Sequence, residues 1–181
     1  AHNLAAVAVK SVPWAFFVAS LRFATGSLIA NSTLVTKVYL PREVFPIAAV
    51  LSQFADFCVA SAALIVVLGL TGSGASVALL WVPVLVIGLV ALCLGLGMFL
   101  SAGAPFFRDV KYRVDVLLTV GIFVTPVFYE ARMLGKWAPL LLINPLGALL
   151  EAMNEVVIRH QAPSYPWLVY AACWAVLGLL I

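Results

Sequence analysis

The sequence predicts an all-α membrane protein, a polytopic helix bundle with about five crossings and a re-entrant helix pair near the outer face. Of its 181 residues, 65% are hydrophobic and 9% are charged, whereas about a quarter of the residues of a soluble domain carry charge. The stretch 57–107 has no charged residue. As one helix it would be about 76 Å long, more than twice the hydrocarbon thickness of about 30 Å, so the chain must turn back within it. This composition excludes a soluble enzyme domain, a nucleic-acid binder and a disordered tail.

Three long apolar segments come first. The first, 12–35, is interrupted only by Arg22. A polar stretch bounded by prolines separates it from the second segment, 46–70, because proline discourages one continuous helix. The second segment ends at residues 71–74, which have the composition of a turn. The third segment, 77–101, precedes a charged cluster.

The rest of the chain predicts shorter elements. The fourth segment, 114–129, is barely long enough to span a membrane. Residues 137–150 contain no charge, and their length suits a re-entrant segment better than a full crossing. Asn144-Pro145 interrupts them, which favours two short helices that enter the membrane and return, with the amphipathic stretch 151–159 as the returning limb. The last segment begins near Pro166.

Basic residues in the short loops predict the sidedness of the bundle. One loop carries Lys37 and Arg42, and another carries Arg108, Lys111 and Arg113. Two crossings separate these loops, so they lie on the same face. Because short cytoplasmic loops are rich in Lys and Arg, this face is predicted to be cytoplasmic.

Two ionisable side chains inside the spans are candidate channel residues. Arg22 and Asp56 should face protein or water, because a charge facing lipid costs several kcal/mol. Each either lines a channel or makes a structural contact between helices, and both alternatives stay open. Tyr129 is a further candidate, since aromatic rings either pack in the interface belt or stack on sugars.

Four motifs, taken in order and spacing, resemble the permease subunit of type-2 ATP-binding-cassette exporters, nearest the branch that exports polysaccharides such as O-antigen, capsule and teichoic acid. They are Val12 to Phe17, Asn31 to Pro46, Phe107 to Val110, and Thr125 to Tyr129 with Ile143 to Leu146. The resemblance implies a single permease domain over residues 1–181 of a six-helix subunit. In that comparison the chain lacks the amino-terminal interfacial helix, the first crossing and the end of the last crossing.

The resemblance also implies partners and a location. These are a second permease copy, a separate ATPase subunit that binds ATP and Mg²⁺, a polysaccharide or lipid-linked glycan as substrate, and the cytoplasmic membrane of a bacterium. The chain itself has no Gly-rich phosphate loop ending in Lys followed by Ser or Thr. No cofactor, metal or catalytic residue is therefore assigned to it.

Three groups of site residues follow from the resemblance. The ATPase-coupling loop would contain Lys37, Tyr39, Pro41, Arg42 and Glu43. The cytoplasmic channel entrance would contain Phe107, Arg108, Asp109, Lys111 and Arg113. The re-entrant region would contain Asn144, Pro145 and Glu151. The sequence departs from the pattern at Asn154, where many members carry an arginine, so no anion-handling role is assigned to this limb.

Other functions compete with polysaccharide export. A small-molecule or drug exporter of the same architecture is the main alternative. An intramembrane lipid- or sugar-modifying enzyme would need converging acid, base or nucleophilic groups, and the clear spans offer only Arg22 and Asp56. A purely structural scaffold is disfavoured by the break at Asn144-Pro145, because irregular backbone at membrane depth is tolerated mainly where it is buried or lines a cavity.

Overall fold

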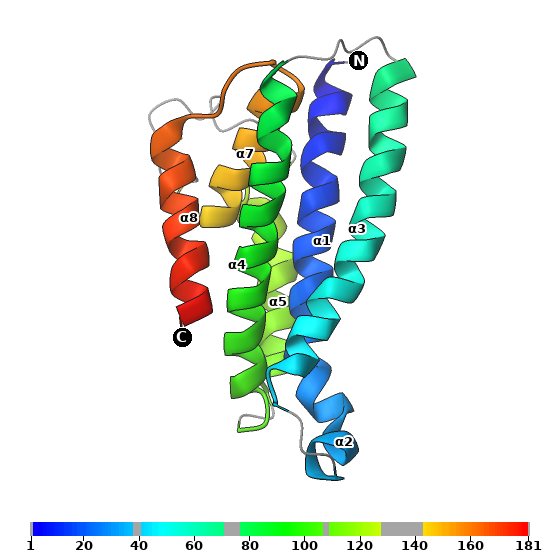
Figure 1. The fold of residues 1–181 in the computed structure, drawn as a ribbon, viewed down its shortest axis with the longest axis vertical. Helices are drawn as coiled ribbons and strands as arrows, with labels where there is room; N and C mark the ends of the chain where they lie inside the picture. Colours follow the sequence, from blue (N-terminus) through cyan, green and yellow to red (C-terminus); the bar gives the residue numbers. More distant parts are fainter. Residues whose placement is uncertain (1, 38–40, 71–76, 107–108, 128–142, 181) are drawn as a thin grey trace.

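The protein is an elongated bundle of helices, and every element in its described part is helical (Figure 1). The computed structural model describes residues 2–37, 41–70, 77–106, 109–127 and 143–180. Three helices are long and apolar enough to cross a membrane: α1 (His2–Ala30), α3 (Val44–Leu70) and α4 (Val82–Gly103). A shorter apolar helix, α8 (Tyr165–Leu180), runs beside α4. The predicted class, an all-α polytopic membrane protein, is confirmed.

Helix α1 is the centre of the bundle and contacts α3, α4, α5 and α7. It begins ten residues before the predicted first segment, so Lys10 and Pro13 both lie inside it. A proline is tolerated within a membrane helix because neighbouring helices satisfy the freed backbone groups. After α1 comes the short helix α2 (Ser32–Lys37). Lys37 is therefore the last residue of a helix, and the prediction that placed it in a loop was wrong.

The α3 and α4 boundaries lie within about five residues of those predicted, and each helix has a proline in its first turn. Pro46 lies in the first turn of α3, where the missing N–H would have no helical partner. A 3₁₀ turn, η1 (Val77–Trp81), leads into α4, whose first turn contains Pro83. Residues 71–76, where a turn was predicted, lie outside the described residues.

Small residues let the helices approach closely. A Cβ atom added to Gly95 on α4 would lie 2.6 Å from the backbone carbon of Gly178 on α8. A Cβ added to Gly97 would lie 3.0 Å from the Cβ of Ala24 on α1. Such contacts are typical of membrane helices, where packing rather than the hydrophobic effect holds helices together.

Helices α5 and α7 are both shorter than a membrane crossing. Helix α5 (Val110–Val124) has 15 residues, about 22 Å, against a hydrocarbon thickness of about 30 Å. Helix α7 (Pro145–Val157) has 13 residues; it begins near mid-height of α4 and ends near the pole that holds the amino terminus (Figure 1). The helix that contains the start of the predicted returning limb thus begins at Pro145 rather than at Glu151. Residues 137–142, where the predicted re-entrant segment begins, lie outside the described residues.

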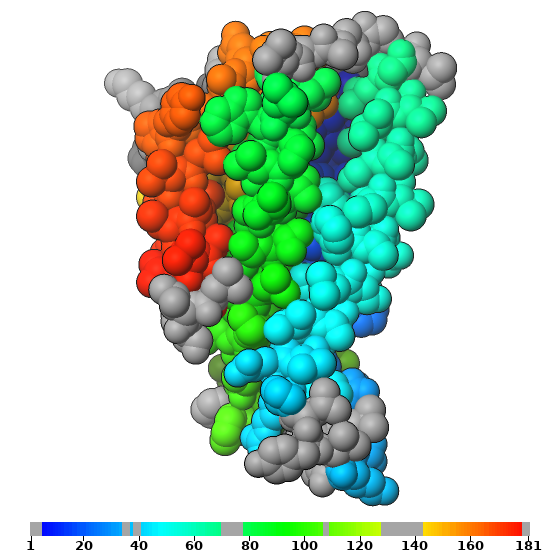
Figure 2. Space-filling view, in the orientation of Figure 1, coloured from blue at the N-terminus to red at the C-terminus, as the bar shows by residue number. Residues whose placement is uncertain are grey.

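The bundle separates a packed interior from a broad apolar exterior. Figure 2 shows α3, α4 and α8 side by side over one face of the molecule. Large exposed apolar side chains occur on these helices and on α5, including Val59, Ile65, Ile87, Leu117 and Val176. An apolar exterior of this extent suits lipid or protein contact rather than water. In contrast, α7 is buried along most of its length.

Candidate functional site

The two basic segments lie at one end of the bundle. Helix α2, the end of α4 and the start of α5 all lie at the pole opposite the amino terminus (Figure 1). The described members of the predicted coupling and entrance groups are exposed there: Lys37, Pro41, Arg42, Glu43, Asp109, Lys111 and Arg113. Tyr39, Phe107 and Arg108 lie outside the described residues. The geometry therefore brings the two predicted groups to one pole.

Two residues of the entrance group belong to a helix and not to a loop. Lys111 and Arg113 lie in the first turn of α5, where basic side chains gain nothing from the helix dipole. Asp109 precedes the helix without making a side-chain capping hydrogen bond. Because none of these charges supports its own helix, all three are available to water or to a partner.

An ion pair between α1 and α5 forms the candidate functional site. Arg22 Nε lies 3.0 Å from Asp115 Oδ1, and Arg22 Nη2 donates to Thr119 Oγ1 at 3.4 Å. Thr119 Oγ1 in turn donates to the Asp115 carbonyl at 2.7 Å. The side chains of Arg22 and Asp115 are 46% and 40% exposed. A half-exposed ion pair within a membrane span requires water or protein on its open side.

We call the surface around Arg22, Asp115 and Thr119 the α1–α5 face. Helix α5 is seated on α1 through the buried Val114 and Leu118. A Cβ atom added to Gly121 would lie 3.2 Å from the ring of Trp14 on α1. Arg22 was predicted from the sequence, whereas Asp115 and Thr119 were not. Asp115 and Thr119 are four residues apart on one short apolar helix, so they lie on the same face of it, and this spacing could have predicted them.

Asp56 is not part of this site. It is exposed on α3, which contacts α1 and α4. Within the described residues it makes no hydrogen bond or ion pair. Tyr129, the third predicted channel residue, lies outside the described residues. The structure thus places two of the three candidates and brings neither into contact with the other.

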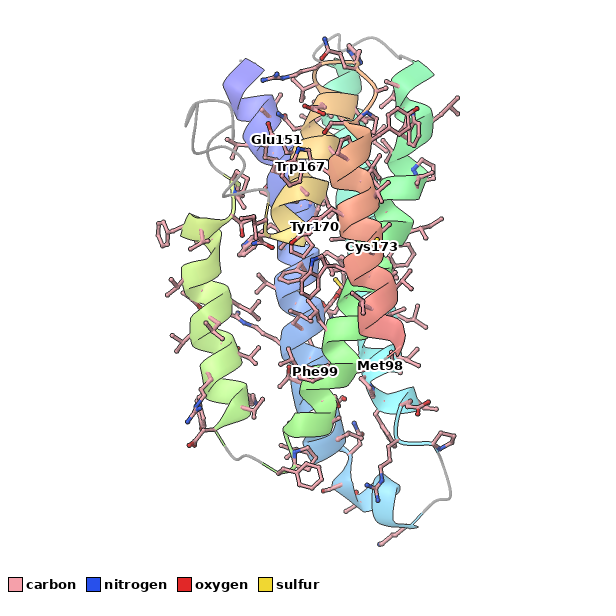
Figure 3. The ribbon with its side chains drawn as sticks, turned by 90° about the vertical axis from the view of Figure 1, so that its left-hand side faces the viewer. Met98, Phe99, Glu151, Trp167, Tyr170 and Cys173 are labelled. Carbon is pink, nitrogen blue, oxygen red and sulfur yellow. The ribbon has the colours of Figure 1, made fainter. Side chains whose placement is uncertain are left out.

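A second ion pair is buried between α1 and α7. Lys10 Nζ lies 2.8 Å from Glu151 Oε2, and the two side chains are 1% and 8% exposed. Figure 3 shows Glu151 in the upper part of the bundle. Asn154, one turn further along α7, is fully buried. Lys10 was not predicted as a site residue, because the predicted first span began two residues after it.

The start of α7 is fixed by hydrogen bonds to two other elements. Asn144 caps the helix by accepting from the Leu146 backbone N–H at 3.1 Å. Its Nδ2 donates to Thr125 Oγ1, just after α5, at 3.1 Å. The Tyr170 hydroxyl on α8 donates to the Ile143 carbonyl at 2.5 Å. Asn144 and Pro145 therefore mark the start of one helix, and Pro145 suits its first turn.

Comparison with known proteins gives consistent relatives. No family model matches the chain. It is 28% identical over 149 residues to an O-antigen export system permease protein RfbA of Klebsiella pneumoniae. This alignment covers 81% of this chain and 58% of that protein. An RfbA permease of Myxococcus xanthus is 29% identical over 174 residues, 93% of this chain and 66% of that protein.

The chain thus spans about 58% to 66% of the length of these curated relatives. The resemblance predicted from the four motifs is confirmed: this chain is related to the permease proteins of O-antigen export systems.

Proposed function

We propose that the chain is the channel-forming part of an exporter permease that moves a long or lipid-linked polysaccharide out of the cytoplasm. The observation that carries this proposal is the similarity to O-antigen export permeases over 81% to 93% of the chain. The half-exposed polar cluster on the α1–α5 face supports it. In this proposal that face lines the translocation path.

The chemistry of the α1–α5 face suits a glycan. Arg22 supplies guanidinium donors and Thr119 supplies a hydroxyl. Arg22 is already neutralised by Asp115, so it binds a passing hydroxyl or anionic group weakly. Weak contact is an advantage in a path, because binding must permit departure as well as entry.

The energy for export comes, in this proposal, from ATP and Mg²⁺ bound to a separate ATPase subunit in the cytoplasmic membrane of a bacterium. That subunit docks on the pole that carries Lys37, Pro41, Arg42 and Glu43, which are all exposed. Asp109, Lys111 and Arg113 surround the channel entrance at the same pole. Two copies of the permease pair to complete the channel.

Arg42→Glu tests the coupling. We expect this charge reversal to lower both the amount of ATPase that co-purifies with the full-length permease and the surface polysaccharide by at least about tenfold, the loss that accompanies about 1.4 kcal/mol of binding energy. The measurement is pull-down and a surface-glycan gel in a strain that lacks its own O-antigen permease. Gln161→Glu, which adds an acid at the opposite pole, is the control and should retain both.

Two outcomes would contradict the proposal. If Arg42→Glu keeps parental ATPase binding and export, the exposed pole does not couple the permease to its ATPase. If the unmodified full-length protein purifies without any nucleotide-binding partner and restores no surface polysaccharide, the export function itself is wrong.

A further inference from the structure

Helix α7 carries polar side chains into the interior of the bundle. Glu151 and Asn154 lie three residues apart, on one face of the helix, and both are buried. Of the two carboxylate oxygens of Glu151, Oε2 contacts Lys10. Within the described residues, Oε1 has no hydrogen-bond partner, and neither do Asn154 Oδ1 and Nδ2.

This arrangement is not explained by stability. A buried ion pair loses its hydration, and replacing it by packed apolar side chains is often neutral or stabilising. A buried polar atom without a partner adds a further cost. In this position α7 therefore carries polar groups that water or hydroxyl groups would satisfy better.

The attachments of α7 suit a movement about its first residues. Its start is pinned through Asn144 to Thr125 and through Ile143 to Tyr170. The contact with Lys10 lies about seven residues, or about 10 Å, further along the helix. Apolar side chains of α7 such as Leu149 and Leu150 belong to the hydrophobic core, and apolar packing has no fixed direction. Release of the ion pair would remove a charged contact between α1 and the outer half of α7 while the start of α7 stays attached.

We propose that Lys10 and Glu151 form a releasable latch that holds α7 against α1, and that export requires the latch to open. When it opens, Glu151 Oε1 and the Asn154 amide bind water or the hydroxyl groups of the passing glycan. The requirement for export rests on the proposed function above. The opening itself does not, because it depends only on the buried polar groups of this chain.

The accessibility of a cysteine on α7 tests the latch without ATP or substrate. Met153→Cys is placed in full-length protein in which the exposed Cys58 and Cys173 are serine, and the buried Cys93 on α4 serves as internal control. Labelling by a water-soluble maleimide follows the open population. With Glu151→Gln, which removes the negative charge that faces buried Lys10, we expect labelling at residue 153 to rise at least about tenfold while Cys93 stays unlabelled.

The matched control is Asp56→Asn, which removes a carboxylate from α3 and should leave the labelling rate at residue 153 at its parental value. Equal labelling of the Glu151→Gln and parental proteins would overturn the proposal. Glu151→Asp, which keeps the charge but shortens the side chain, gives the same test should Glu151→Gln fail to accumulate.

The double variant Lys10→Met/Glu151→Met separates a latch from a static contact. Both side chains become apolar with similar length, so the fold should keep its thermal midpoint. Without the polar groups of this pair, α7 gains fewer hydrogen bonds by moving away from α1. We therefore expect export to fall at least about tenfold while labelling at residue 153 stays slow. Parental export in this double variant would show that the pair is only structural.

The two proposals fail in different ways. If the parental protein exports no polysaccharide, the proposed function is wrong, yet the response of labelling to Glu151→Gln still decides whether the latch exists. If export proceeds normally and labelling does not respond, the latch is wrong and the proposed function stands.

Discussion

Helix α1 carries two ion pairs that lie in different environments. Lys10 and Arg22 are twelve residues apart, about 18 Å along the helix. Arg22 and its partner are 46% and 40% exposed, whereas Lys10 and its partner are 1% and 8% exposed. The comparison shows that one membrane helix carries charge in two environments: the Arg22–Asp115 pair is accessible, and the Lys10–Glu151 pair is buried against a neighbouring helix.

Both partner helices are too short to cross the membrane. Asp115 is on α5 and Glu151 is on α7, and the two helices are connected at Thr125 and Asn144. Each short helix therefore receives one ion pair from the long helix α1. Because a short helix buries less apolar area against its neighbours than a full span does, a polar attachment contributes a larger share of what holds it in place.

The largest difference between the two pairs should appear in stability. Lys10→Met leaves the Glu151 carboxylate buried without its counter-charge, and we expect a loss of about 3–5 kcal/mol in the free energy of unfolding. Arg22→Met leaves Asp115 partly hydrated, and we expect a loss under about 1 kcal/mol. Unfolding measured in bicelles by steric trapping compares the two. Equal losses of unfolding free energy in the two variants would show that the difference in exposure does not affect stability.

The coupling free energies of the two ion pairs should respond differently to ionic strength. A double-mutant cycle on Arg22 and Asp115 should give a coupling free energy of about 0.5 kcal/mol that declines as salt is raised from about 0.05 to about 0.5 M, because salt screens accessible charges. The same cycle on Lys10 and Glu151 should change little with salt. A salt-sensitive Lys10 cycle would mean that water already reaches the buried pair.

The smallest expected effects concern two glycines on either side of the α1–α5 face. Gly121→Ala would press a methyl group against Trp14, since the added Cβ lies 3.2 Å from the ring. We expect a loss below about 1 kcal/mol in stability and a small displacement of α5. Gly26→Ala meets no atom within 4 Å and should gain about 0.5–1 kcal/mol of helix stability. Thermal unfolding of both variants tests whether α5 is seated tightly where the structure places it.

The sequence predicted the start of α3 to within two residues, because Pro46 lies in its first turn. The predicted third segment began at Val77, where η1 and not α4 begins, and the predicted returning limb began six residues after the start of α7. The prediction failed where a charge was taken as the end of a span. Lys10 lies inside α1, and Lys111 and Arg113 lie inside α5. A charge can therefore interrupt an apolar segment without ending the helix.

The membrane class, the approximate lengths of the spans and the relationship to export permeases were determined by the sequence itself. Apolar length and charge density are properties of consecutive residues, so they need no knowledge of neighbours. Only the tertiary structure decided that Lys10 meets Glu151, 141 positions away, and that Arg22 meets Asp115. Whether a charge is buried or accessible depends on which helices pack together, and that is fixed by contacts between segments that are remote in the chain.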